Sequence, residues 1–206
     1  MNEADRESLE QRIRAAHAQE DLGEAARFAI EGYGPEILAF LMAMTQNSDN
    51  AADVFAQFCE DMWKGLPAFR WGSSFRTWAY TIARNSFRRF LRDPNRRHNV
   101  RLETSDLFKV QQRVRTQTMP FLLTHIKDRF AALRESLTPD DQTLLILRLD
   151  RRLSWLEIAE VMSEDGEATD PREIKKKAGS LRKRYERLKA RLRDMVEKDG
   201  MLDEFE

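Results

Sequence analysis

Apolar residues recur at helical spacing along almost the whole chain, and this periodicity leaves little room for a sheet. The clearest case is Phe75, Trp78, Ala79 and Ile82, which repeat in steps of three and four. Alternating stretches of Val, Ile and Thr, which indicate strands, are missing. The chain has 206 residues, of which 41% are hydrophobic, so it contains enough apolar material for a core. We therefore expect an all-α protein with one medium domain or two small ones.

Breaks in this periodicity predict two small helical domains joined by a flexible linker. The ring of Pro94 disfavours helical geometry at Asp93, so the helix that starts near Phe75 should end there. The stretch that follows is polar and carries few large apolar residues. The expected boundaries are 1–92 for the first domain, 93–119 for the linker, 120–200 for the second domain and 201–206 for an acidic tail.

Capping patterns mark the expected helix starts of the second domain. Thr138, Ser154 and Asp170 each precede an acidic residue by three positions, so that the side-chain oxygen and the acid can satisfy first-turn amides. In the first domain, the segment from Gly32 to Pro35 predicts a break between two helices, the second of which runs to Thr45.

Charge is strongly segregated along a chain whose formal net charge is zero. Residues 1–63 hold 4 basic and 13 acidic residues, whereas 64–101 hold 10 basic and 1 acidic, and 172–193 hold 11 basic and 2 acidic. Two basic blocks in an acidic chain indicate a polyanionic partner, for which nucleic acid is the first candidate. The alternative is that each block is only a solvated helix face.

Several classes of chemistry find no support in the sequence. A single cysteine, Cys59, excludes an intrachain disulfide, and three scattered histidines do not form a zinc-binding pattern. There is no glycine-rich phosphate loop and no nucleophile elbow. The amino terminus is acidic where a signal peptide is basic, and no apolar run reaches the length of a membrane span. We expect a cytoplasmic, non-catalytic protein without metal, cofactor or membrane contact.

Two segments carry the candidate functional residues. Trp71 lies between Arg70 and Gly72 in a short loop, where an aromatic ring beside cations suits stacking on an unpaired base. The alternative is that Trp71 folds back over the following helix as a lid. In the second domain, a short helix, a long turn over 163–170 and a basic helix fit a helix-turn-helix. The alternative there is an antiparallel coiled coil.

The string FRWGSSFRTWAYTIARN at Phe69 to Asn85 resembles the promoter-melting segment of the extracytoplasmic-function sigma factors, a branch of the sigma-70 family of bacterial RNA polymerase. Downstream, Leu137-Thr138-Pro139 and LSWLEIAEVM resemble the fourth region of the same family. The resemblance covers nearly the whole chain apart from the linker and the tails. It implies an alternative sigma factor that binds core RNA polymerase, directs it to promoter DNA and assists melting.

The resemblance also implies three groups of site residues. Core-polymerase contacts fall on Asp53, Gln57, Glu60, Asp61 and Trp63. Contacts to the minus-ten element fall on Phe69, Arg70, Trp71, Ser73, Ser74, Arg76, Arg84, Asn85, Arg88 and Arg92. Contacts to the minus-thirty-five element fall on Arg172, Lys175, Lys176, Ser180 and Lys183.

The chain departs from the family pattern where it bears on polymerase binding. Gln57 stands where the family usually has a carboxylate, and Glu60 and Asp61 are the candidates to substitute for it. One hypothesis is that a modification or a partner restores this negative charge. An anti-sigma factor or a modifying regulator is a further expected partner. The competing functions are a stand-alone helix-turn-helix regulator that binds duplex DNA without polymerase and a helical adaptor without DNA contact.

Overall fold

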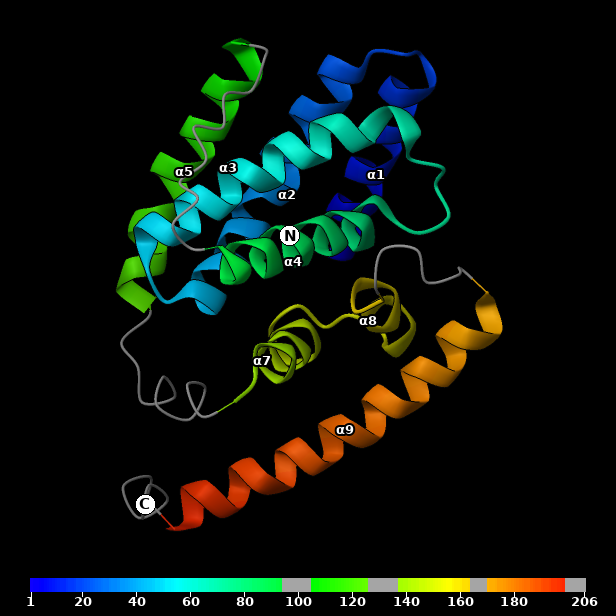
Figure 1. The fold of residues 1–206 in the computed structure, drawn as a ribbon. Coiled ribbons are helices and arrows are strands. Elements are labelled where there is room, and N and C mark those ends of the chain that lie inside the picture. Colours follow the sequence, from blue (N-terminus) through cyan, green and yellow to red (C-terminus); the bar gives the residue numbers. More distant parts are fainter. Residues whose placement is uncertain (94–104, 126–136, 164–169, 199–206) are drawn as a thin grey trace. The chain divides into compact units, whose positions relative to one another are not determined.

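The computed structural model describes residues 1–93, 105–125, 137–163 and 170–198. Helices make up nearly all of these residues, and the described ranges contain no strand, so the all-α prediction is confirmed (Figure 1). The chain divides into two compact units, Met1–Ile126 and Lys127–Glu206. No helix in the described part of the chain is both long and apolar enough to cross a membrane.

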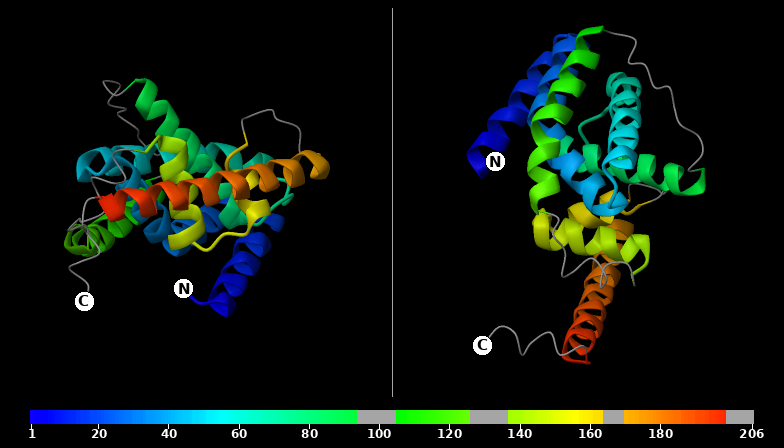
Figure 2. Two further views of the ribbon diagram at one scale, coloured as in Figure 1. Left: turned by 90° about the horizontal axis from the view of Figure 1, so that it is seen from below. Right: turned by 90° about the vertical axis from the view of Figure 1, so that its left-hand side faces the viewer.

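The first unit is built around one central helix. Helix α2 is rich in buried apolar side chains and is packed on several sides by other helices (Figure 2). Burial on several sides explains why its apolar residues do not form a single narrow stripe. The helices of this unit are α1 (Glu3–Ala18), α2 (Leu22–Thr45), α3 (Ser48–Gly65), α4 (Phe75–Arg92) and α5 (Ser105–His125), with a short 3₁₀ turn at Leu66–Ala68.

The break expected between Gly32 and Pro35 does not occur, because α2 is continuous through Pro35. Packing explains the difference. A Cβ atom on Gly34 would lie 3.0 Å from Val114 Cγ1 of α5, so the glycine serves a close helix–helix approach rather than a turn. The neighbouring helices stabilise α2 by burying its apolar side chains, which outweighs the local cost of one proline.

Helix α5 belongs to the first unit, although it covers the later part of the expected linker 93–119 and the first residues of the expected second domain. Leu107, Val110 and Val114 are buried at helical spacing, and α5 packs on α2 and α3. Arg113 also forms an ion pair with Glu31 of α2. These few apolar residues stand in an otherwise polar segment, so the stripe was not recognised from the sequence. The remaining part of the expected linker, 94–104, and the tail 201–206 lie outside the described residues.

The second unit places a long basic helix on two short ones. Its elements are α7 (Pro139–Leu145), which continues into a π-helical turn at Ile146–Asp150, then α8 (Trp155–Val161) and α9 (Pro171–Lys198). Helix α9 packs on α7 and α8 and buries Ala178, Leu181, Tyr185 and Leu188. Most of the turn predicted over 163–170 lies outside the described residues.

The predicted helix starts of the second unit are confirmed. Thr138 accepts a hydrogen bond from the amide of Asp141, and Ser154 forms a full capping box with Glu157. The carboxylate of Asp170 accepts from the amide of Arg172 at 2.9 Å. Each cap satisfies an amide that has no partner within the helix, which fixes the residue at which the helix begins.

Candidate nucleic-acid interface

Helix α4 and the loop before it carry the candidate minus-ten residues. Arg70 and Arg92 are exposed, and Asn85 and Arg88 are partly exposed. Ser74 is the N-cap of α4 and accepts from the amide of Thr77 at 3.1 Å. These side chains give the first unit a discontinuous basic surface that spans the loop and one side of α4.

Arg76 and Arg84 do not belong to this surface, which corrects the prediction for both. Arg76 is only 5% exposed and its Nε lies 2.6 Å from Glu36 Oε1 of α2. Arg84 is only 3% exposed. A step of four residues turns about 40° further than a full helical turn. Residues 84, 88 and 92 therefore rotate from the buried side of α4 through its edge to solvent.

Phe69 is also buried rather than open to solvent, at 8% exposure. Its ring stacks on Trp78 with 4.5 Å between centroids and makes an edge contact with Phe75 at 5.7 Å. Such offset and edge-on pairs are the favoured aromatic arrangements. The prediction that Phe69 is available for base contact is therefore wrong for this conformation, in which it is a core side chain beneath the loop.

Trp71 is folded back, and its ring meets that of Phe75 at the start of α4 with 6.3 Å between centroids. Its ring centroid lies 4.9 Å from that of Phe69, and its Nε1 donates to His17 Nδ1 of α1 at 3.4 Å. The ring nevertheless remains partly exposed. His17 received no role from the sequence, because its contact with Trp71 joins residues 54 positions apart.

The candidate polymerase-binding residues lie on α3. Asp53 is exposed, and Gln57, Glu60, Asp61 and Trp63 are partly exposed. All five are therefore accessible from solvent to some degree, although their accessibility alone does not establish a polymerase contact.

Asp61 differs from the others because its carboxylate already joins α3 to α4. It accepts from Gln57 Nε2 at 2.9 Å, from Ser86 Oγ at 2.8 Å and from Arg89 at 2.5 Å. Glu60 pairs with Lys64 one helical turn further along α3. The Asp61 carboxylate therefore has partners on both α3 and α4, whereas Lys64, with which Glu60 pairs, lies on α3 itself.

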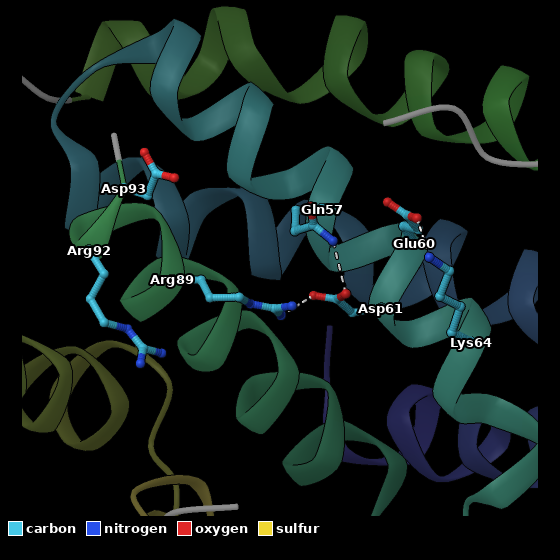
Figure 3. A pocket seen from close by; sticks show the side chains of 7 residues that line it. All are labelled: Gln57, Glu60, Asp61, Lys64, Arg89, Arg92 and Asp93. Carbon is cyan, nitrogen blue, oxygen red and sulfur yellow. Dashed lines mark hydrogen bonds and ion pairs between the residues drawn. The ribbon is translucent and has the colours of Figure 1, made fainter. Parts of the chain in front are cut away.

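These side chains line a polar cavity of about 620 Å³ between α3 and α4 (Figure 3). Figure 3 shows Gln57 and Arg89 converging on Asp61 from the two helices. The cavity contains acidic and basic groups in equal number and is lined by Gln57, Glu60, Asp61, Lys64, Arg89, Arg92 and Asp93. It is a charged crevice at the edge of the α3 surface.

The candidate minus-thirty-five residues share one side of α9. Arg172, Lys175, Lys176, Ser180 and Lys183 are all exposed, and they lie on the helix opposite its buried apolar stripe. Arg187, which the sequence pattern did not single out, is exposed on the same side one turn beyond Lys183. A helix with one apolar side in a core and one basic side in solvent is suited to lie against DNA phosphates.

An ion pair anchors α9 to α7. Arg184 Nε donates to Asp141 Oδ1 at 2.7 Å. Partial burial by itself raises the pKa of Asp141, but hydrogen bonds from Arg184 and Thr138 outweigh it and hold that pKa below the ordinary value. Because the same carboxylate accepts from the Thr138 cap, it links the start of α7 to the middle of α9.

Cys59, the single cysteine of the chain, is buried. Burial raises the pKa of the Cys59 thiol, which favours its protonated, unreactive form. The described residues contain no group of His, Cys, Asp and Glu side chains able to hold a metal ion.

A helical protein whose two units each expose a basic surface is a candidate nucleic-acid-binding protein. Comparison with known proteins identifies the family. Residues 29–97 match the family described as Sigma-70 region 2. The chain is 32% identical over 136 residues to the RNA polymerase sigma factor YlaC of Bacillus subtilis (strain 168), an alignment that covers 63% of this chain and 75% of that relative. The chain therefore belongs to the sigma-70 family, as a sigma factor of the extracytoplasmic-function type.

Proposed function

We propose that this alternative sigma factor guides core RNA polymerase to its promoters through two separate DNA contacts, one from each unit. Family membership supports polymerase and promoter DNA as its partners. The first unit binds the polymerase through the solvent side of α3 and engages the minus-ten element through the loop and exposed side of α4. The second unit binds the minus-thirty-five element through the exposed side of α9. The polymerase, and not this chain, carries out the chemical reaction of transcription.

The observation that carries the two-contact proposal is the division of α9 into two faces. One face supplies the core of the second unit, and the other presents Arg172, Lys175, Lys176, Ser180 and Lys183 to solvent. Helix α9 has 28 residues, about 42 Å of helix, which exceeds the width of the major groove. The amino-terminal part of α9 enters the groove, and Arg187 lies where the helix leaves it, near the phosphate backbone.

The burial of individual side chains changes which residues we propose to contact the minus-ten element. It keeps the loop residues Arg70, Trp71, Ser73 and Ser74 together with Asn85, Arg88 and Arg92 of α4. It loses Phe69, Arg76 and Arg84, whose burial supports a role in holding α4 and the loop in place. Exposed cations then bind backbone phosphates, while the loop accepts the unstacked strand; unstacking costs a few kcal/mol per step.

Transcription from promoter fragments tests the proposal. Core RNA polymerase with this chain should initiate transcription at defined start sites. Replacement of Lys175 and Lys176 should reduce transcription only from promoters that depend on an upstream element. Duplex binding by the chain alone, without initiation on adding core polymerase, would favour the stand-alone regulator instead.

A further inference from the structure

One side of α1 faces the loop that precedes α4. Glu10, Arg14 and His17 follow one another at steps of four and three, so they lie on the same side of the helix. All three contact residues between 66 and 76. Helix α1 lies outside the residues matched by the family model, 29–97, and it carries none of the site residues named above.

Glu10 fixes the end of the loop at which α4 begins. Its Oε2 accepts from the amide of Phe75 at 2.8 Å, and its Oε1 accepts from the amide of Arg76 at 2.9 Å. Ser74 satisfies the next amide, that of Thr77. The first three amides of α4 thus all have acceptors, two of them from a carboxylate on another helix. A negative charge at this helix end is also favoured by the helix dipole.

The Glu10 carboxylate is itself held in place. It accepts a hydrogen bond from the hydroxyl of Tyr33 at 2.7 Å, and Tyr33 is buried in the centre of the unit. Burial and the neighbouring Glu10 raise the pKa of Tyr33, so this hydroxyl keeps its proton and remains a donor. Glu10 is therefore a fixed acceptor rather than a freely moving surface acid.

His17 fixes the opposite end of the loop. Its Nε2 lies 2.9 Å from the carbonyl oxygen of Leu66, the residue at which the 3₁₀ turn begins. Its Nδ1 accepts from the indole Nε1 of Trp71. A neutral imidazole can donate from one nitrogen and accept at the other, so a single ring serves both contacts. The two rings also meet edge to face, with centroids 5.8 Å apart.

Trp71 is held in a backbone conformation that a bulky residue avoids. Its φ is +57°, in the left-handed region, which costs about 1–2 kcal/mol for a residue with a Cβ. The contacts with His17 and Phe69, and the guanidinium of Arg14 at 5.3 Å from the indole ring, compensate for that cost. Two of these three contacts, those of His17 and Arg14, come from α1, so the loop geometry depends in part on that helix.

We propose that Glu10 and His17 are positioning residues for promoter melting: α1 holds both ends of loop 66–74 and the Trp71 indole, so that the loop is formed before the DNA strand arrives. The inference rests on the proposed function. Preorganisation of this kind lowers the ordering cost paid during strand capture. Loss of either side chain leaves polymerase binding intact but makes duplex opening slower.

The test compares Glu10→Gln and His17→Phe in holoenzyme assembled with core RNA polymerase. Each holoenzyme transcribes the same promoter as a duplex and as a template with a pre-melted bubble. Glu7→Gln, on the exposed side of α1, is the matched control. We expect duplex transcription to fall at least fivefold for both variants, while bubble transcription and affinity for core polymerase change less than twofold. The control should match the wild type on both templates.

A second measurement separates positioning from folding. If His17 acts through Trp71, His17→Phe should have little further effect on duplex opening in a Trp71→Ala background, because coupled residues are not additive. Equal losses on duplex and bubble templates, full additivity with Trp71→Ala, or no loss at all would overturn the inference. Failure of the wild-type holoenzyme to open duplex promoters would overturn the proposed function itself, and the inference with it.

Discussion

Replacing Arg76 by alanine should lower the free energy of unfolding of the first unit rather than weaken DNA binding directly. The Arg76 and Glu36 side chains are only 7% and 18% exposed, and their closest N–O distance is 2.6 Å. Breaking a buried ion pair by removing one partner costs about 3–5 kcal/mol, because the other charge stays buried. Glu36 keeps the hydrogen bond from the Tyr80 hydroxyl at 2.8 Å. We therefore expect a loss near the lower limit, about 3 kcal/mol.

The measurement is urea unfolding of the full-length chain followed by tryptophan fluorescence. Three of the four tryptophans, Trp63, Trp71 and Trp78, lie in the first unit. A Trp155→Phe background therefore restricts the signal to that unit. About 3 kcal/mol is a large share of the 5–15 kcal/mol typical of a domain, so the midpoint should shift clearly.

Arg70→Ala is the matched control, because Arg70 is an exposed arginine of the same segment proposed to bind DNA. It should change the free energy of unfolding by less than about 0.5 kcal/mol while reducing promoter binding. If Arg76→Ala left the unfolding midpoint unchanged and reduced promoter binding as much as Arg70→Ala, Arg76 would be a DNA contact and the burial argument would fail.

Three further predictions concern other parts of the chain. Asp141→Asn should destabilise the second unit by about 1 kcal/mol at neutral pH. Because the folded pKa of Asp141 is depressed, its contribution to stability is present above the ordinary carboxyl pKa and is lost as pH falls through the lower folded value. When unfolding is measured as a function of pH, the difference in unfolding free energy between wild type and variant should therefore disappear at low pH. The Cys59 thiol should react with a thiol reagent only after denaturation, and rapid labelling of the native chain would contradict its burial. Replacing Lys175 and Lys176 should reduce the salt dependence of holoenzyme–promoter binding by about 0.9 in log–log slope for each DNA phosphate that the variant no longer neutralises, whereas an unchanged slope would exclude phosphate binding at both positions.

The sequence was a good guide where local physics decides the outcome. The caps at Thr138, Ser154 and Asp170 depend on residues three positions or fewer away, and the structure confirms all three. The exposed basic side of α9 also follows from periodicity, because its apolar stripe alone fixes which residues face solvent.

Prediction was less successful where a contact joins distant segments. The resemblance placed Arg76 and Arg84 among the residues that contact the minus-ten element, but both side chains are buried, and Arg76 pairs with Glu36 of α2. The partner of Trp71 is His17, and an isolated histidine on a charged helix gives no local signal of that role. Glu10 was equally hidden, since its partners are backbone amides 65 and 66 residues away.

Helix α5 shows a related limit. Its buried residues are few and are spaced by polar side chains, so composition favoured a linker. The close approach at Gly34 and the ion pair between Arg113 and Glu31 become visible only when α2 and α5 lie side by side.

Run-off transcription with purified core RNA polymerase is the most direct test of the central claim, that this chain is the promoter-recognition subunit and not a DNA-binding protein acting alone. We predict initiation at defined sites only when chain and core are both present, with feeble binding of the chain to promoter duplex until core is added. Tight duplex binding in the absence of polymerase, together with no initiation in its presence, would contradict the claim.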